Sequence, residues 1–296
     1  MNFVYSPQYR AEIGSHVFPM EKYVMILARL RAEGLADDDN VHLPRRPTDE
    51  QLRKIVTPEY LDDLLNCRIT RRTYPSELPV KQGIIDMQIL CCGGSYLAAQ
   101  LALKHGMCYH IGGGFHHAFA DHAEGFCYLN DVVFSAVMML EQGMQRVAII
   151  DCDLHQGNGT AKFFEQEKRV FTFSIHQESL YPVKQTSDLD IGLPNDAGDD
   201  EYLPRLESAL ERIFGGFGPD CAIYVAGADP YVLDQLGNLR LTVEGLRQRD
   251  GLVIGRAVTS RVPVATVLAG GYAENVEDTV EIHCNTARTM AHYHTT

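Results

Sequence analysis

The chain has 296 residues, 45% of them hydrophobic, which supplies one large core and is close to the size at which a single core stops growing. One domain spanning residues 1–296 is therefore expected. Lys and Arg number 26 against 39 Asp and Glu, and the net charge of −13 argues against direct binding to nucleic acid or anionic lipid, whereas a basic protein tail would be attracted.

The N-terminus lacks a basic segment followed by an apolar run, and no run of about 18 apolar residues occurs anywhere. Neither a secretion signal nor a membrane span is expected, so the predicted location is cytoplasmic, or also nuclear in a eukaryote. The eight cysteines are scattered through apolar surroundings without paired Cys-x-x-Cys spacing, which predicts reduced core residues. The oligomeric state is left open by the sequence.

The first quarter of the chain predicts mainly helices. A short apolar segment at Asn2–Tyr5 precedes a helix over Met20–Glu33, where apolar residues recur at helical spacing. Asp37–Pro47 is polar and is predicted to be a surface loop, and the next helices are expected at Asp49–Ile55 and Pro58–Leu65.

From residue 84 onward, helical patterns alternate with short apolar runs typical of buried strands. The predicted helices are Ile84–His105, Asp131–Gln142, Tyr202–Phe214 and Glu244–Thr259, and the predicted strands are Tyr109–Gly112, Val147–Asp151, Val170–Ile175, Cys221–Ala226 and Val264–Leu268. This alternation predicts an α/β fold with a central, mainly parallel sheet.

Polar residues follow the predicted strands, at the sheet edge where open parallel sheets bind ligands. Asp153 and His155 alternate along one segment, and Asp229 follows another strand, so two carboxylates and an imidazole are expected to converge. Three such ligands and a position left for water predict a catalytic zinc site, although a single Asp at a strand end more often caps a helix.

Two histidines, His116 and His117, follow three glycines that allow a tight turn. Near neutral pH a histidine can accept a proton from water, provided that its other ring nitrogen is oriented by a partner. Asp151 and Asn158 are the predicted partners, and because only Asp is charged, the two histidines should differ in basicity.

Tyr272 follows Gly270 and Gly271 and is placed to donate a hydrogen bond to an oxyanion. An isolated tyrosine of this kind is more often a buried aromatic with a satisfied hydroxyl. Its position beside the other predicted groups favours the catalytic interpretation.

These motifs together resemble the zinc-dependent histone deacetylases. The matching segments are Gly112–Ala118, Gly125–Asp131, Asp151–Gly159, Gly227–Pro230 and Ala269–Tyr272, within residues 84–285. Tyr5-Ser6-Pro7, the segment Gly270–Glu274 and Asn158 look most like the class IV branch or its class II-like bacterial relatives. The resemblance implies an arginase-like three-layer α/β/α sandwich and hydrolysis of the amide of an acyl-lysine in a protein or peptide.

By this resemblance, the zinc ligands would be Asp153, His155 and Asp229. The general base would be His117, with Asn158 behind it, and the electrostatic partner would be His116, with Asp151 behind it. Tyr272 would be the tyrosine that polarises the substrate carbonyl. Phe126 and Tyr181 would form the aromatic walls of the acyl-lysine tunnel, and the Gly125 carbonyl would contact the substrate amide. A potassium ion is also implied, held mainly by backbone oxygens of Asp151, Asp153, His155, Ser174 and Ile175.

The chain departs from the family pattern at three positions: Phe115 replaces a common Trp, Gln156 a common second His, and Asn158 the Asp of class I. Other activities stay open. One is hydrolysis of acetylpolyamines or other small amides, for which a predicted acidic loop containing Asp188, Asp190, Asp196, Asp199 and Asp200 could attract a cationic substrate, although such a run of acidic residues is more often a solvated loop. Another is removal of long fatty acyl chains. A protein that only binds acyl-lysine would have lost a ligand or Tyr272, and the chain keeps them.

Overall fold

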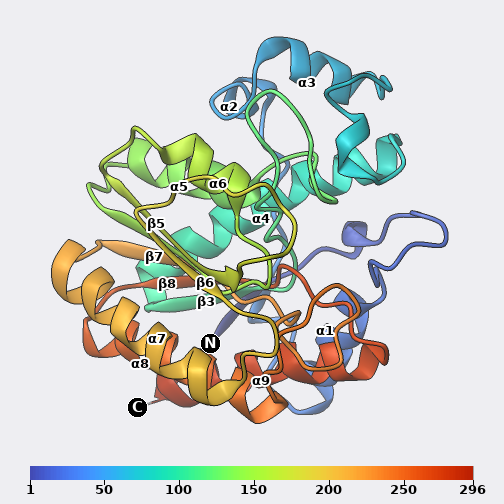
Figure 1. Ribbon diagram of the computed structural model, residues 1–296. Coiled ribbons are helices and arrows are strands. Elements are labelled where there is room, and N and C mark those ends of the chain that lie inside the picture. The colour runs from blue at the N-terminus through green and yellow to red at the C-terminus, as the bar shows by residue number, and fades with distance from the viewer. Residues whose placement is uncertain (296) are drawn as a thin grey trace.

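The computed structural model describes residues 1–295, and within them the backbone forms one open sheet of eight parallel strands (Figure 1). The strands are β1 (Asn2–Val4), β2 (Val41–His42), β3 (Met107–His110), β4 (Val147–Asp151), β5 (Val170–Gln177), β6 (Leu189–Leu193), β7 (Cys221–Val225) and β8 (Val264–Val267). Their order across the sheet is β2-β1-β3-β8-β7-β4-β5-β6. The predicted sheet is confirmed, and it is parallel throughout.

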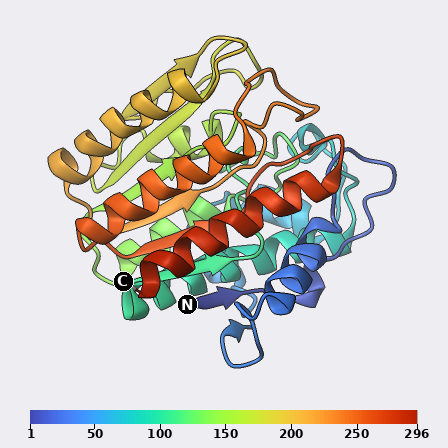
Figure 2. The same cartoon turned by 90° about the horizontal axis from the view of Figure 1, so that it is seen from below.

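Helices cover both faces of the sheet, which gives the predicted three layers. They are α1 (Lys22–Ala32), α2 (Asp49–Leu52), α3 (Pro58–Leu65), α4 (Gln82–His105), α5 (Asp131–Glu141), α6 (Asn158–Phe164), α7 (Asp199–Leu210), α8 (Val243–Thr259) and α9 (Val276–Thr295). Helices α4, α5 and α6 lie on one face, and α7, α8, α9 and α1 pack side by side across the other (Figures 1 and 2). The short helices α2 and α3 lie away from the sheet, at the top of Figure 1.

The central strands are buried on both faces, which explains their continuous apolar sequence. All residues of β4 and of β7 are buried. Helix α4 is long and apolar enough, by length and composition, to cross a membrane, but 72% of its most apolar window is buried inside the fold. It is therefore accounted for as a core helix, packed against α5, β3 and β8.

Helix boundaries follow from capping residues in the sequence. Thr57 accepts a hydrogen bond from the Tyr60 amide and Pro58 occupies the first turn of α3, where a missing N–H costs nothing. Asn130 accepts from the Val133 amide at the start of α5, and this cap also fixes the loop that leads into the site.

One side of the sheet differs from the sequence prediction. Asn2–Tyr5 contributes β1, which lies between β2 and β3, and the predicted loop Asp37–Pro47 contains the edge strand β2, whose Val41 pairs with Phe3. Strands of three and two residues are too short for an alternating pattern to be recognised, so neither was predicted. Helices α6 and α9 were also not predicted, and the predicted helix Tyr202–Phe214 begins earlier, at Asp199, and continues beyond Leu210 as a π-helix over Glu211–Phe217.

The five residues of the predicted acidic loop do not form one loop, because Asp190 lies in β6 and Asp199 and Asp200 lie in α7, whereas Asp188 and Asp196 lie in the irregular segments on either side of β6. Asp188 accepts hydrogen bonds from the amide and hydroxyl of Thr172, and Asp190 lies in β6. Asp199 begins α7 and accepts from Thr242, while Asp196 pairs with Arg240; Asp200 follows in the first turn of α7.

Candidate metal and catalytic site

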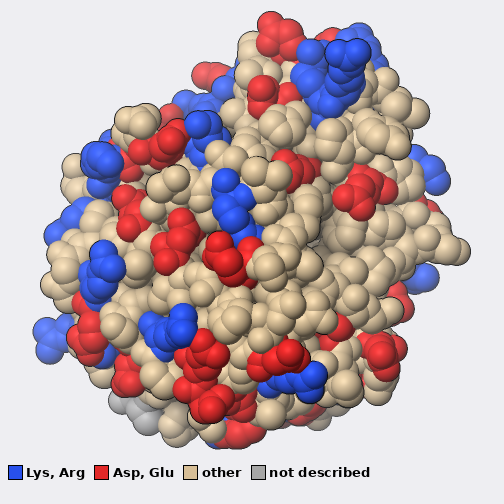
Figure 3. Space-filling model, in the orientation of Figure 1, with Lys and Arg blue, Asp and Glu red and all other residues tan. Residues whose placement is uncertain are grey.

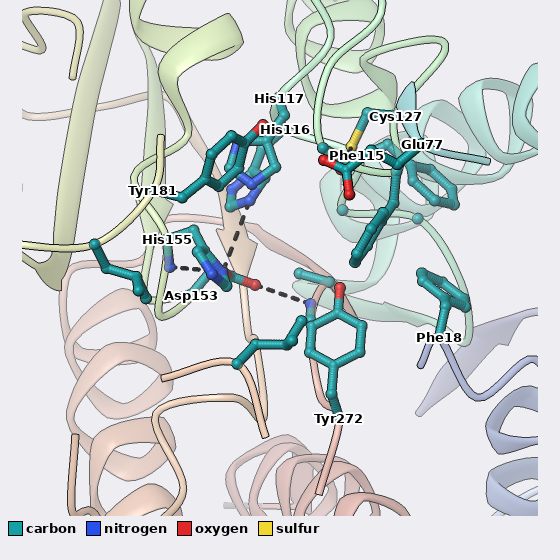
Figure 4. A pocket seen from close by; sticks show the side chains of 18 residues that line it. Phe18, Glu77, Phe115, His116, His117, Cys127, Asp153, His155, Tyr181 and Tyr272 are labelled. Carbon is teal, nitrogen blue, oxygen red and sulfur yellow. Dashed lines mark hydrogen bonds and ion pairs between the residues drawn. The ribbon is translucent and has the colours of Figure 1, made fainter. Parts of the chain in front are cut away.

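The loops that follow β3, β4, β7 and β8 meet in one cavity of about 210 Å³ (Figure 4). This convergence follows from the strand order, because these four strands are neighbours and their carboxyl ends share one edge of the sheet. Polar groups lie at its inner end and aromatic and aliphatic side chains form its walls.

Asp153, His155 and Asp229 form a group that can hold a metal ion. One ligand atom from each residue lies within 4.8 Å of the others, and all three residues are buried. His155 Nδ1 is 3.4 Å from Asp153 Oδ1 and 3.4 Å from Asp229 Oδ2. Asp153 and His155 lie in a bend just beyond β4 rather than in an extended strand, and this bend brings both side chains to the same point.

The chemistry of these three residues fits a divalent cation. Asp229 Oδ2 is buried and has no hydrogen-bond partner among residues 1–295, although Oδ1 of the same carboxylate accepts from the Leu154 amide at 3.0 Å. Burial and the adjacent Asp153 carboxylate raise the pKa of Asp229 to about 6. A cation between the two carboxylates would relieve this repulsion, and two oxygens and one nitrogen are ligands that zinc accepts.

Gly270 allows the backbone to approach these ligands. Its amide donates a hydrogen bond of 2.8 Å to Asp153 Oδ2, and a Cβ atom at this position would stand 2.1 Å from Asp229 Oδ2. The buried side chain of Lys22 holds the same turn from behind, donating at 2.8 Å to the Ala269 carbonyl.

The two histidines lie side by side, with ring centroids 4.1 Å apart. His116 Nδ1 is 2.7 Å from Asp151 Oδ2; burial alone would lower the pKa of His116, but Asp151 and Asp153 outweigh burial and raise it to about 9. His117 Nδ1 is instead 2.8 Å from the Asn158 side-chain oxygen. Burial, with the His116 and His155 rings, lowers the pKa of His117 well below its ordinary value. Of the two, His117 is the neutral imidazole near pH 7.

Tyr272 points its hydroxyl into the cavity from the side opposite the histidines (Figure 4). Its backbone is fixed by two neighbours: the amide donates to Asp234 at 2.7 Å, and the carbonyl accepts from Gln235. Burial raises the pKa of the Tyr272 hydroxyl well above its ordinary value, so the group remains a hydrogen-bond donor.

Phe126 and Tyr181 both line the cavity, as does Gly125. The Tyr181 ring is 5.3 Å from the His117 ring, and a Cβ atom at Gly125 would stand 2.6 Å from the Tyr181 hydroxyl and 2.7 Å from His117. Only glycine lets the chain pass between these two side chains. Phe18 also lines the wall, with its ring 6.0 Å from that of Tyr272.

A buried Arg249, which was not predicted from the sequence, supports the loops that carry Asp153 and Asp229. Its Nη1 donates to the carbonyls of Gly227 at 2.5 Å and Cys152 at 3.3 Å, next to the ligand-bearing segments. Its Nη2 and Nε donate to Asp250 at 2.8 and 3.0 Å. Arg249 is fully buried, and nothing in the local pattern of α8 signals a buried cation.

A second buried network holds the loop that carries the histidines. Tyr9 lies 2.6 Å from His110 Nε2, Ser95 lies 3.0 Å from His110 Nδ1, and Ser95 bonds in turn to Asp131. Burial lowers the pKa of His110 to about 3, so the ring is neutral and accepts at Nε2 while donating at Nδ1. The Asp131 carboxylate accepts hydrogen bonds from the backbone amides of residues 114 and 115, just before His116.

The remaining sequence expectations are placed as follows. Ser174 pairs with Asp151 across β4 and β5, and Ile175 is the next residue of β5, so these members of the predicted potassium site are neighbours; the ion itself stays a prediction. Gln156 donates to the Gln185 carbonyl and to Asp190, and thereby ties the loop after β4 to the segment before β6.

Phe115 is a buried wall residue of the cavity. Seven of the eight cysteines are buried and Cys67 is partly exposed, and all eight are free thiols.

The fold and site together are those of an α/β protein with three residues that can hold a metal ion at the carboxyl edge of its sheet. A model of the histone deacetylase domain matches residues 16–287. The chain is 39% identical to an uncharacterized protein of Picosynechococcus sp., covering 95% of each chain. It is 29% identical to "Histone deacetylase 2" of Arabidopsis thaliana, over 90% of this chain and 73% of the relative.

It is also 28% identical to a "Probable deacetylase" of Archaeoglobus fulgidus, over 88% of this chain and 77% of the relative. The crystal structure of the HDA15 HD domain superposes with a TM-score of 0.83 over 98% of this chain and 91% of that one; at 22% identity, this likeness concerns the fold. The chain belongs to the histone deacetylase family, and it is accordingly a hydrolase of the deacetylase type.

Proposed function

We propose that the protein hydrolyses the amide of Nε-acetyl-lysine in peptides or proteins, with Zn²⁺ held by Asp153, His155 and Asp229. The observation that carries the proposal is the meeting of this triad with a histidine pair and a tyrosine hydroxyl at the inner end of an apolar-walled cavity. A bound zinc ion would polarise the amide carbonyl and lower the pKa of a water molecule to about 7.

The side chains of this chain then have separate roles. His117 is neutral, and its Nδ1–H is held by Asn158, so Nε2 is free to take the proton of the attacking water. His116, charged beside Asp151, stabilises negative charge that develops at the carbonyl oxygen and carries a proton suitable for the leaving lysine amine. The Tyr272 hydroxyl donates a hydrogen bond to the oxyanion.

The walls of the cavity support an acyl-lysine side chain as the group that enters it. The rings of Phe18, Phe126 and Tyr272 form an apolar wall against which aliphatic carbons can pack. The names of two relatives, "Histone deacetylase 2" and "Probable deacetylase", support acetyl as the proposed acyl group.

A groove beside the cavity mouth supports a peptide rather than a polyamine. Glu77 and Tyr181 line both hollows, and the groove, of about 980 Å³, is otherwise mostly apolar. Its wall includes Ile69 and Tyr74, each 76% exposed. Residues that flank an acetyl-lysine would lie there. Acidic and basic side chains are interspersed over the face drawn in Figure 3, and basic side chains gather only near its top. This face therefore has no continuous basic surface that would bind nucleic acid.

The test is turnover of the zinc-loaded protein on one lysine peptide carrying an acetyl, octanoyl or myristoyl group, beside acetylated polyamines. We expect cleavage of the acetyl peptide that a chelator abolishes and added Zn²⁺ restores. Cleavage of polyamines alone would establish the small-molecule activity instead, and preference for myristoyl would contradict acetyl as the proposed acyl group. Turnover with and without K⁺ tests the proposed potassium site.

A further inference from the structure

Glu124 lies one residue before the Gly125–Phe126 wall and connects three side chains around the site. Its Oε1 accepts hydrogen bonds of 3.0 Å from the Asn158 amide group and 3.0 Å from the Tyr181 hydroxyl, and its Oε2 is 3.8 Å from His122 Nε2. Its backbone is fixed by reciprocal hydrogen bonds with Cys127, at 3.0 and 2.9 Å. Only 21% of its side chain is exposed.

Asn158 is fully enclosed and has a different partner at each end of its side-chain amide. The oxygen faces His117 Nδ1 at 2.8 Å, and the nitrogen faces Glu124. Asn158 is 1% exposed, so water does not compete for either end. A continuous line of hydrogen bonds therefore runs from His117 through Asn158 to a carboxylate.

We propose that Glu124 is a positioning residue for the hydrolysis, acting through Asn158 to fix the tautomer of His117 and to stabilise its protonated form. This inference rests on the proposed role of His117 as the base. The side-chain amide of Asn158 links His117 to the Glu124 carboxylate, whereas His116 contacts the Asp151 carboxylate directly.

Each hydrogen bond in this line is fixed by which atom can donate and which can only accept. An ionised carboxylate only accepts hydrogen bonds, so Asn158 must turn its NH₂ group toward Glu124 and its oxygen toward His117. That oxygen also only accepts, so the hydrogen of the neutral His117 ring must be on Nδ1. Nε2 is then the unprotonated nitrogen. When His117 gains a proton, the same line of hydrogen bonds ends on a negative charge, which strengthens each bond in it.

Glu124 is suited to remain ionised. Burial raises the pKa of its carboxyl, but the interactions with His122, Asn158 and Tyr181 outweigh burial and hold the pKa below its ordinary value. Within residues 1–295 no Lys or Arg side chain is recorded in an ion pair with Glu124, so its charge is directed at this network.

The substitution Glu124→Gln tests the charge while keeping the shape. A glutamine presents either an oxygen or an NH₂ group to Asn158, so both orientations of the Asn158 amide become possible and the His117 tautomer is no longer fixed. The first measurement is ¹⁵N NMR of the histidine rings in zinc-loaded protein, with the His117 signals identified by their loss in His117→Gln. We expect a single Nδ1–H tautomer in the unchanged protein and a mixture in Glu124→Gln.

The second measurement is steady-state turnover of an acetyl-lysine peptide. We expect Glu124→Gln to lower kcat about tenfold, because a charge-assisted hydrogen bond is replaced by a neutral one, with KM changed less than about twofold. Adding Asn158→Asp to Glu124→Gln places a carboxylate directly behind His117 and should recover most of the lost kcat. Asn158→Asp alone should be less active than this double variant, because two adjacent carboxylates repel each other.

Asp121→Asn is the matched control, because it also removes one carboxylate charge, three residues before Glu124. The Asp121 side chain contacts His122, as Glu124 does, but it does not contact Asn158. An equal loss of kcat in this control, an unchanged His117 tautomer in Glu124→Gln, or failure of the double variant to recover would each overturn the proposal. The ring NMR requires no substrate. If the unchanged protein cleaves no acetyl-lysine, the proposed function fails, while the tautomer measurement still decides the role of Glu124.

Discussion

Replacing Tyr272 by Phe removes one oxygen atom from the wall of the cavity. The hydroxyl points into the cavity, and the hydrogen bonds recorded for this residue within residues 1–295 are made by its backbone, to Asp234 and Gln235. Removing the hydroxyl therefore leaves no buried protein group without a partner, and the free energy of unfolding should change by less than about 0.5 kcal/mol.

The effect on turnover should be large. Loss of one donor to an oxyanion typically costs about 2.7–4 kcal/mol of transition-state stabilisation, which lowers kcat by roughly 10²–10³. KM should change little, because the substrate amide carries less charge on its oxygen than the transition state does. Zinc content should be unchanged, since Tyr272 is outside the ligand triad.

The assay is steady-state cleavage of an acetyl-lysine peptide by zinc-loaded Tyr272→Phe, with urea unfolding and metal analysis of the same preparation. Tyr231→Phe is the control, because its hydroxyl bonds at 3.3 Å to Asp278 on α9 and does not line the cavity. Near-normal kcat in Tyr272→Phe, or a loss explained by missing zinc, would refute the oxyanion role.

Three further outcomes are expected. Asp229→Asn should lower the amount of zinc that the protein retains during dialysis against a chelator. The metal-free variant should melt at the same or a higher temperature than the unchanged protein, because the repulsion between Asp229 and the buried Asp153 is relieved, and a lower melting temperature would contradict this. Arg249→Met leaves Asp250 buried without its cation and should lower the urea-derived free energy of unfolding by about 3–5 kcal/mol, with Asp250→Asn recovering part of the loss. Free Zn²⁺ at about 100 times its Kd should stabilise the unchanged protein by about 2.7 kcal/mol, measured as a rise in melting temperature that Asp229→Asn abolishes.

The inner strands of the sheet could be predicted because each of them has a characteristic sequence of its own. Strands β3, β4, β5, β7 and β8 are confirmed, since a strand buried on both faces is an uninterrupted apolar run bounded by turn residues. Strands β1 and β2 have only three and two residues, and the edge strand β6 is partly exposed and contains Asp190 and Gly192, so none of the three shows such a run. Helix α7 begins three residues before the predicted start because its first turn, Asp199–Glu201, is acidic and has no apolar residue that would extend the helical pattern.

The candidate site was predictable to the extent that strand ends carry it. The triad, the histidine pair and Tyr272 each follow an apolar run, and they lie around one cavity. Phe18, Glu124 and Arg249 were missed for a different reason. Each acts through a contact with residues far away in the sequence, and the composition around it, a loop or an amphipathic helix, is ordinary. Glu124 directly precedes the Gly125 motif, and this position in the sequence could have identified it.

The hydrogen bonds from Tyr9 through His110 and Ser95 to Asp131 connect the N-terminal segment to the loop that carries the two histidines. Tyr9 does not line the cavity, yet a displacement of its side chain would be transmitted to that loop through His110. An affinity tag fused at the N-terminus therefore needs a spacer that leaves β1 free to pair with β3.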